Sequence, residues 1–230
     1  MVPKQPPHRP CIALIADMVK SREVPSGQRP MIQQQFQALV VALNKKFAGK
    51  LFSKFVITLG DEFQGLLSSS SPIPDIIWYL EEAFPELGLR VGIGFGNLYT
   101  PFQKYAINVD GPALHAARSA IENAKLKRAL GGVFSGFGQL DYVLNGIARI
   151  LWFHRSKLTN HQRTILNFLH QGLSQAEIAD RLRVSRQNIS KQVASSGWFP
   201  YSEAEKSWRI ILSDYVDPLM GAGNNDAHCN

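Results

Sequence analysis

The sequence predicts an α+β fold, in which a ferredoxin-like or palm-type domain is followed by an all-α domain. Residues 11–138 alternate short apolar runs with amphipathic segments in the order strand, helix, hairpin, helix, strand, helix, which is the order of that domain type. Residues 157–215 instead hold short helical segments that follow capping residues, and residues 139–156 are predicted to form a connecting helix. A chain of 230 residues is long enough for two small domains.

The first predicted elements are a strand and a helix. The strand is the apolar run 12–16, which ends at Asp17. Apolar residues then recur at helical spacing over residues 32–47 and predict an amphipathic helix of roughly four turns, with Gly49 as its C-cap. Residues 1–10 are rich in proline, and we expect them to be disordered.

Two adjacent acids, Asp61 and Glu62, stand between the apolar runs 55–59 and 63–67. This pattern predicts a β-hairpin with carboxylates at its tip. Acids at the ends of neighbouring strands can share divalent cations that carry a nucleotide's phosphates. We therefore expect a Mg²⁺ or Mn²⁺ site with Asp17, Asp61 and Glu62 as ligands. The alternative is that Asp61 and Glu62 are simply turn residues.

The second half of this domain is predicted to be a helix from about Pro74, a strand over 89–96 and a helix opened by residues 110–112. Glycines alternate along the strand and allow the close approach of a backbone or a ligand. Arg118 on the following helix is a candidate for binding phosphates or a transition-state charge; the alternative is a solvated or ion-paired helix residue. Gly131–Gly132 is predicted to end the unit.

The C-terminal domain is predicted to be a helix-turn-helix unit. Thr159, Ser174 and Ser185 are placed as N-caps of successive helices, and Gly197 ends the third. The turn between the last two carries Arg183, where glycine is common in such motifs. A protein-docking role is the alternative to DNA binding.

The third helix of this unit presents side chains that can reach base edges and phosphates. Residues 208–212 are expected to add a small strand as a wing, and residues 217–230 to be disordered. The candidate DNA-binding residues are Arg183, Arg186, Gln187, Asn188, Ser190 and Lys191.

The net charge of +7 is unevenly distributed along the chain. Residues 155–198 hold seven basic and two acidic residues, a net charge of +5. Such an excess in a short segment is typical of nucleic-acid-binding modules, because phosphate neutralisation releases counterions.

Other features exclude several classes of protein. The sequence has no apolar run that would span a bilayer and no apparent signal peptide, so we expect a cytoplasmic protein. Cys11 and Cys229 do not suggest a structural disulfide. Neither zinc-ligand spacing nor a P-loop is present.

Four blocks of the sequence together resemble the SatD family: IALIADMVKSR at 12–22, ITLGDEFQGLL at 57–67, RVGIGFG at 90–96 and DGPALHAAR at 110–118. The resemblance covers roughly residues 11–198. It implies the two-part architecture rather than a particular activity.

The same blocks more distantly resemble the catalytic domains of class III nucleotidyl cyclases and GGDEF domains. That resemblance implies metal binding by Asp17 and Asp61 and a transition-state role for Arg118. Leu114 stands where cyclases place asparagine, and Leu59 replaces the first glycine of GGDEF. We therefore expect nucleotide binding without cyclisation.

Further polar residues near these blocks are candidates for holding the nucleotide. Lys54 falls near the base-recognition lysine of cyclases, and His115 is a possible general base or base-edge contact; the alternative for His115 is a packed or surface residue. The full candidate set is Lys20, Arg22, Lys54, Gly60, Asp110, His115 and Arg118.

These observations favour a nucleotide-responsive, DNA-binding transcription regulator that acts as a homodimer, because helix-turn-helix proteins usually read paired half-sites. The alternative is a metal-dependent nucleotidyl cyclase or nucleotidyltransferase that makes a cyclic nucleotide or oligonucleotide signal. In that enzyme Asp61 and Arg118 would be catalytic.

Overall fold

The structure is a computed structural model that describes residues 10–19, 21–84, 88–126 and 131–221. Within these residues, five strands form one mixed sheet in the order β2-β3-β1-β4-β5. The pairs β2–β3, β3–β1 and β1–β4 are antiparallel, and the pair β4–β5 is parallel. The strands are β1 (Cys11–Met18), β2 (Leu51–Leu59), β3 (Glu62–Leu67), β4 (Leu89–Gly96) and β5 (Gly131–Ser135).

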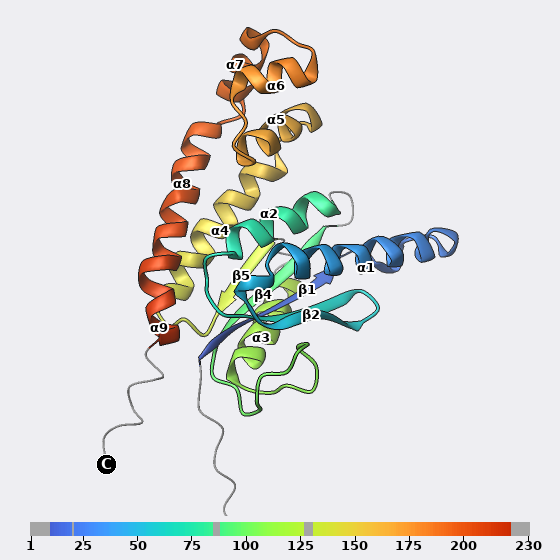
Figure 1. Cartoon of the computed structure of the whole chain (residues 1–230), viewed down its shortest axis with the longest axis vertical. Coiled ribbons are helices and arrows are strands. Elements are labelled where there is room, and N and C mark those ends of the chain that lie inside the picture. Colours follow the sequence, from blue (N-terminus) through green and yellow to red (C-terminus); the bar gives the residue numbers. More distant parts are fainter. Residues whose placement is uncertain (1–9, 20, 85–87, 127–130, 222–230) are drawn as a thin grey trace, which may run out of the picture.

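The chain from β1 to β4 follows the predicted β-α-β-β-α-β order, with α1 (Arg29–Lys46) after β1 and α2 (Ile73–Ala83) before β4. The predicted hairpin is confirmed, because β2 and β3 pair with only Gly60 and Asp61 between them. The helix predicted from residue 110 is α3 (Pro112–Leu126). The mixed α+β fold is therefore confirmed for this part of the chain (Figure 1).

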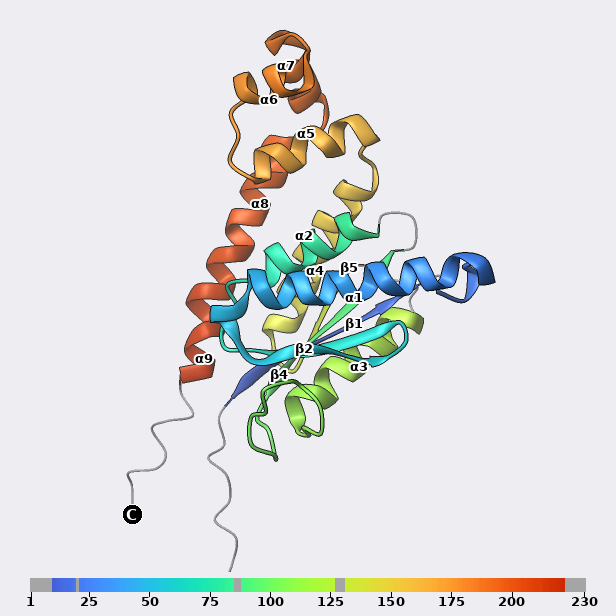
Figure 2. The same cartoon turned by 45° about the vertical axis from the view of Figure 1, so that its right-hand side comes forward.

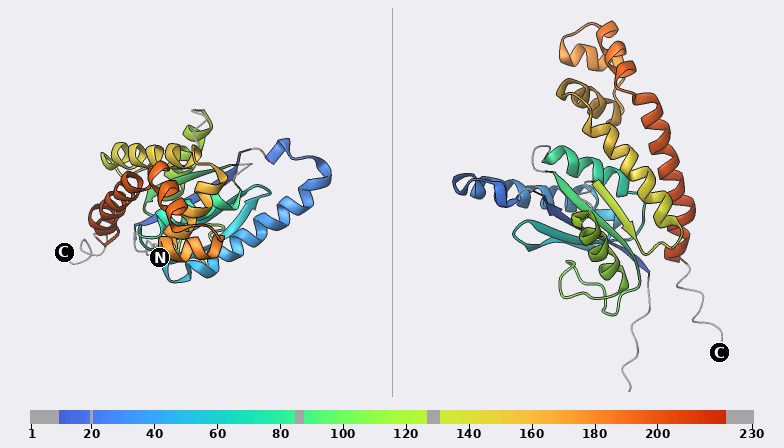
Figure 3. Two further views of the ribbon diagram at one scale, coloured as in Figure 1. Left: turned by 90° about the horizontal axis from the view of Figure 1, so that it is seen from above. Right: turned by 180° about the vertical axis from the view of Figure 1, so that it is seen from behind.

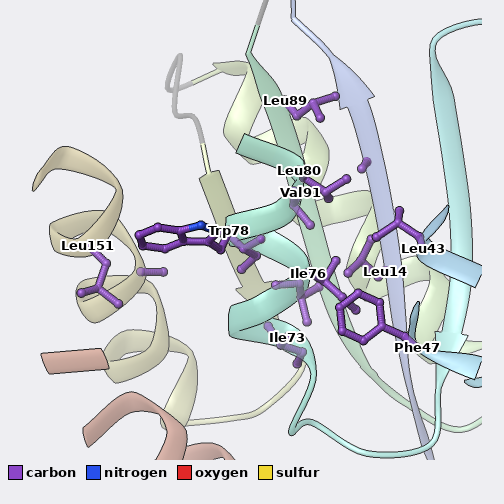
Figure 4. Close-up of a cluster of buried hydrophobic side chains, with 14 of the residues drawn as sticks. Leu14, Leu43, Phe47, Ile73, Ile76, Trp78, Leu80, Leu89, Val91 and Leu151 are labelled. Carbon is purple, nitrogen blue, oxygen red and sulfur yellow. The ribbon is translucent and has the colours of Figure 1, made fainter. Parts of the chain in front are cut away.

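The two faces of the sheet are covered by different helices. In β1, Ile12 and Leu14 point into a core shared with α1 and α2, whereas Ala13 and Ile15 point into a second core against α3. This alternation follows from the two-residue period of a strand. Figure 4 shows the first core, in which side chains of α2 pack between the central strands and the neighbouring helices.

The alternating glycines of β4 accommodate a helix backbone. A Cβ atom at Gly94 would lie 2.1 Å from the Ala117 nitrogen and 2.2 Å from the Ala113 oxygen, and one at Gly92 would lie 2.3 Å from the Ala117 oxygen. The close approach predicted at these glycines is therefore made by α3, and no space for a ligand exists there.

Strand β5 was not predicted from the sequence. Gly131–Gly132, predicted to end the domain, instead begins this strand, and α4 (Leu140–Ser156) follows it. Asn145 of α4 accepts a hydrogen bond from the Phe134 backbone nitrogen and donates one to its oxygen, both at 2.8 Å. The side chain amide thus satisfies the strand edge much as a further strand would.

The next three helices begin where the capping residues predict. They are α5 (Asn160–His170), α6 (Gln175–Leu182) and α7 (Arg186–Ser195). Thr159, Ser174 and Ser185 each accept a hydrogen bond from the backbone nitrogen three residues later. Gly197 ends α7 and has φ of 71°.

The predicted wing strand at residues 208–212 is wrong. These residues belong to α8 (Trp198–Ile211) and the π-helical turn Leu212–Val216. Tyr201, Trp208, Leu212 and Val216 are buried at helical spacing, which is the pattern that decides for a helix. Residues 217–221 form α9 (Asp217–Gly221) instead of a disordered tail; residues 222–230 and the predicted lead-in 1–9 lie outside the described residues.

Helix α8 carries the chain back from α7 to the sheet. It packs along α4, as Figures 1 and 2 show. At its end, Ser70 donates a hydrogen bond to the Leu212 oxygen (2.8 Å), and the Ser70 nitrogen donates one to Asp217 (2.6 Å). One hydrophobic core therefore runs from β1 to Val216 across the predicted domain boundary.

No described helix combines the length and the apolar character that crossing a membrane requires.

We predict that Gly94→Ala destabilises the protein by at least about 3 kcal/mol, because the added methyl group meets helix backbone that cannot rotate away. Urea unfolding followed by circular dichroism measures the change. Gly49→Ala is the matched control, since a Cβ atom there meets open space. Equal stability of the two variants would contradict the close packing of α3 on β4.

Candidate functional site

Polar residues gather at the end of the sheet where β1 finishes and β3 and β4 begin. The strand register places Asp17 directly opposite Glu62 on one side and Arg90 on the other. A pocket of about 490 Å³ opens at this edge. Its polar lining consists of Asp17, Ser21, Glu23, Asp61, Glu62, Arg90 and Lys125.

Asp17 is buried between two basic side chains. Arg90 and Lys125 each place a nitrogen 3.5 Å from its Oδ2 atom. Burial raises the pKa of Asp17, and the neighbouring charges of Lys125 and Arg90 oppose that shift. Its Oδ1 atom is also buried, and no hydrogen-bond partner for it exists among the described residues. Asp17 thus has an oxygen able to accept a ligand.

Glu62 is buried and fully engaged within the protein. Arg118 donates to both of its carboxylate oxygens, at 2.8 Å to Oε1, and Thr58 donates to Oε1 at 2.9 Å. Burial raises the pKa of Glu62, but the hydrogen bonds from Arg118 and Thr58 outweigh it, so the pKa is lowered. Arg118 is therefore ion-paired in this structure, as in the alternative interpretation of the sequence.

Asp61 occupies the hairpin turn and remains partly exposed. Ser21 donates a hydrogen bond to its Oδ2 atom (2.5 Å), and the Met18 nitrogen donates to its backbone oxygen (3.0 Å). These bonds tie the hairpin to the segment that follows β1. Asp61 lines the same pocket as Asp17.

A smaller, more apolar pocket of about 240 Å³ adjoins the first, and Met18, Ser21 and Asp61 line both. It lies between the hairpin turn and the start of α1, where Gln33 donates a hydrogen bond to the Gly60 oxygen (3.0 Å). Its further lining residues are Val24, Arg29, Ile32, Gln33, Phe36 and Gly60. Sequence reasoning missed this pocket, because Ile32 and Phe36 were interpreted only as the core-facing side of a helix.

Three predicted nucleotide-binding residues lie away from these pockets. Lys54 is exposed on the edge strand β2, where its backbone pairs with Lys104 and Ala106. Asp110 and His115 form an exposed pair (2.8 Å) near the start of α3, at the opposite end of β4 from Asp17. Gly60 lines the apolar pocket. Lys20 and the side chain of Arg22 lie outside the described part of the structure.

The predicted metal ligands fit a cation only in part. In the described residues, Asp17, Asp61 and Glu62 do not belong to any group of three ligand atoms within 4.8 Å of one another. Glu62 does not fit a metal because Arg118 and Thr58 occupy its oxygens. Asp17, with its unpaired oxygen, and Asp61 do fit Mg²⁺ or Mn²⁺, since Mg²⁺ is often bound by one or two carboxylates plus substrate phosphates.

A separate group, Asp75, His170 and Glu205, does bring its ligand atoms within 4.8 Å. Arg209 already supplies the positive charge there, with Nη2 at 2.7 Å from Asp75 and 2.5 Å from Glu205. Burial alone would raise the pKa of Glu205, but hydrogen bonds from His170 and Arg209 lower it to about 2. The group is an ionic contact between α2, α5 and α8.

The predicted DNA-binding residues lie together at one end of the molecule. In α7, Ile189 and Val193 are buried, which turns the polar side of the helix outward. The backbone of Arg183 in the preceding turn is left-handed, with φ of 55° and ψ of 44°, the conformation for which glycine is favoured. The exposed residues of this surface are Arg183, Arg186, Gln187, Asn188, Ser190 and Lys191.

Part of the basic charge predicted for this region is used internally. Arg155 is buried and pairs with Glu81, and Arg163 pairs with Glu82 at 3.2 Å. Both acids belong to α2. These arginines therefore anchor the C-terminal helices on the sheet domain and do not contribute to the outward surface.

The sequence pattern of the SatD family matches residues 11–207. The chain belongs to the SatD family. The match covers the sheet, the pocket and the helices through most of α8. No curated protein sequence matches the chain significantly.

Two solved structures are similar to parts of this SatD-family chain. A bacterial light-regulated adenylyl cyclase has a TM-score of 0.41 and 11% identity, over 58% of this chain and 45% of that one. The guanylyl cyclase domain of the RhoGC fusion protein from the aquatic fungus Blastocladiella emersonii has a TM-score of 0.32 and 14% identity, over 48% of this chain and 72% of that one. This chain spans less than half of the bacterial cyclase. The fold assignment rests on the strand order.

We predict that Arg118→Met lowers the free energy of unfolding by about 3 kcal/mol, because it leaves the buried Glu62 carboxylate without its countercharge. Glu62→Gln alone should cost less, since Arg118 is partly exposed and can be solvated. Combining Glu62→Gln with Arg118→Met should restore part of the stability lost in Arg118→Met. Urea unfolding of the four proteins forms a double-mutant cycle.

Arg186→Met provides the control for this cycle, since Arg186 is exposed on α7 and should change stability by less than about 0.5 kcal/mol. If Arg118→Met were as stable as the control, the pair would have no structural role.

Proposed function

We propose that this protein is a DNA-binding transcription regulator whose sheet domain binds a nucleotide. The observation that carries the proposal is the outward face of α7, where Arg186, Gln187, Asn188, Ser190 and Lys191 are all exposed. Arginine, asparagine and glutamine are the side chains that pair bidentately with guanine and adenine edges, and lysine can bind phosphate. In this proposal the protein acts in the cytoplasm, as expected from the sequence.

In this proposal α6 and α7 are the two helices of a helix-turn-helix motif, with α7 as the recognition helix. The turn between them is short. Arg183 ends α6 with a left-handed backbone conformation, and its side chain is exposed. The N-terminal turn of α7 carries three of the candidate base contacts, Arg186, Gln187 and Asn188. Recognition helices meet base edges with this turn. Ser185 caps this turn and fixes its direction.

The nucleotide would occupy the joined pockets at the end of β1. Arg90 and Lys125 supply positive charge beside Asp17, as phosphates require. Mg²⁺ or Mn²⁺ would be held by Asp17 and Asp61 and would bridge to the phosphates. The adjoining apolar pocket, with Ile32 and Phe36, offers a surface for a planar base.

Binding without turnover is favoured by the state of Arg118. A transition-state arginine must point at the reacting phosphate, whereas this guanidinium donates to both oxygens of Glu62. The second candidate function is a nucleotidyl cyclase or nucleotidyltransferase. It is supported by the unpaired Asp17 oxygen in the same pocket as Asp61.

We predict that Arg186→Ala weakens binding to the protein's specific duplex by about 10-fold to 100-fold, the usual effect of losing one base-edge contact. Lys191→Ala should weaken binding to all duplexes and reduce the slope of log K against log salt by about 1. Fluorescence anisotropy with duplexes selected from a random library measures both effects.

Lys45→Ala is the matched control for these variants, because it removes the same charge from the exposed end of α1. If the protein bound no duplex at any salt concentration, α7 would be a protein-docking helix and the regulator proposal would be wrong.

We predict that Asp61→Asn reduces Mg²⁺-dependent nucleotide affinity at least about 10-fold and leaves the melting temperature nearly unchanged, since the turn side chain is partly exposed. Calorimetric titration with ATP and GTP, with Mg²⁺ and with EDTA, gives the affinities. Loss of the fold with unchanged affinity per folded molecule would instead make Asp61 a turn residue.

Pyrophosphate release separates the two candidate functions. Wild-type protein that binds a nucleoside triphosphate should release none with either Mg²⁺ or Mn²⁺. Release that is abolished by Asp61→Asn, which is expected to keep the fold, would establish the enzyme.

A further inference from the structure

The outward face of α4 has an unusual composition. The exposed residues between positions 142 and 153 are Tyr142, Val143, Gly146, Arg149, Ile150 and Phe153. Among these described residues of α4, Arg149 carries the only charge. The apolar side chains are 86%, 45%, 67% and 57% exposed in chain order. We call these six residues the α4 stripe.

The α4 stripe is regular. Its members recur every three or four residues, so they form one line along the helix opposite the buried Leu144, Ala148 and Leu151. A helix that is apolar on both sides is normally covered on both sides. From behind, the helix crosses the outside of the molecule between α2 and α8 (Figure 3, right).

Gly146 lies at the centre of the stripe. A Cβ atom there would meet open space, so the fold of one chain does not require glycine at this position. In a helix interior glycine is about 1 kcal/mol less favourable than alanine. The absence of a side chain does, however, let a second helix approach the α4 backbone closely.

We propose that the α4 stripe is the interface of a homodimer, in which α4 of each copy packs antiparallel against α4 of the other with the two Gly146 residues at the crossing. We choose the antiparallel direction because it brings Arg149 of each copy to Tyr142 of the other. In that arrangement the turn with Tyr142 and Val143 faces the partner's turn with Arg149 and Ile150. Each guanidinium then stacks on a tyrosine ring, and the same patch serves both copies, as a two-fold axis requires.

A parallel pair would leave these groups unmatched. Tyr142 of one copy would face Tyr142 of the other. Arg149 of one copy would lie beside His154 of the other, and His154 is already hydrogen-bonded to the Ser196 oxygen of its own chain. A second copy fits better than an unrelated partner, because the stripe itself supplies both groups of the proposed cation–π contact, Arg149 and Tyr142. The proposal uses no residue of α7 or of the two pockets at the end of β1, so it can fail or succeed independently of the proposed function.

Sedimentation velocity on the full chain tests the dimer. Wild-type protein should be dimeric at micromolar concentration, and Ile150→Glu should weaken dimerisation at least about 30-fold by placing a charge at the centre of the interface. Val41→Glu is the matched control, because Val41 is equally exposed (68%) but lies on α1; it should dimerise like the wild type. Circular dichroism confirms that both variants are folded.

Cysteine cross-linking tests the direction of the pair. The Cys229→Ser change leaves Cys11 as the one native cysteine. Cys11 is buried and its pKa is raised to about 12, so that cysteines introduced on the α4 stripe react selectively. Gly146→Cys should form a disulfide with itself, and a mixture of Val143→Cys and Ile150→Cys chains should form mixed dimers. A monomeric wild type, a dimeric Ile150→Glu variant, or efficient self-cross-linking of Ile150→Cys would each overturn the proposal.

Discussion

The contact between α3 and β4 determines the geometry of the candidate site. Because Gly92 and Gly94 carry no side chains, the backbone of α3 lies directly on the strand. That depth lets Arg118 reach Glu62 and brings Lys125, at the end of the same helix, within 3.5 Å of Asp17. A helix held farther from the sheet by larger side chains would leave Glu62 without its countercharge and Asp17 with Arg90 alone.

Helix α2 plays a comparable part between the sheet domain and the C-terminal helices. One side packs into the core against the central strands, with Ile76 and Leu80 fully buried (Figure 4). Its other side carries Asp75, Glu81 and Glu82, which bind basic residues of α8, α4 and α5 respectively. We therefore expect a displacement of α2 to reach the helices that carry α7.

Sequence reasoning was accurate where a residue acts through its immediate neighbours. The hairpin and the caps at Thr159, Ser174 and Ser185 depend on local backbone chemistry and were predicted correctly. Strand β5 was missed because its glycine-rich sequence resembles a loop, and its stability comes from pairing with β4 and from Asn145, which lies eleven residues beyond Phe134.

The sequence predicted where the acids of the candidate site lie, but it did not predict which basic side chains pair with them. The register that places Asp17 opposite Glu62 follows from the strand pattern. The alignment of Arg118 with Glu62 depends on how deeply α3 lies on the sheet. The alternating glycines of β4 predict a close approach, but they do not predict that α3 makes it. Similarly, Arg155 and Arg163 contribute to the net charge of a basic segment, and only the tertiary structure pairs them with acids of α2.

The return of α8 along α4 has a mechanical consequence. A unit joined to its neighbour by a single segment can swivel about that segment, whereas α5 to α7 are held by two packed helices that are both anchored on the sheet domain. Two helices packed side by side, such as α4 and α8, resist twisting better than one helix does. We therefore expect a displacement at the base of α4 and α8 to be passed on to α7.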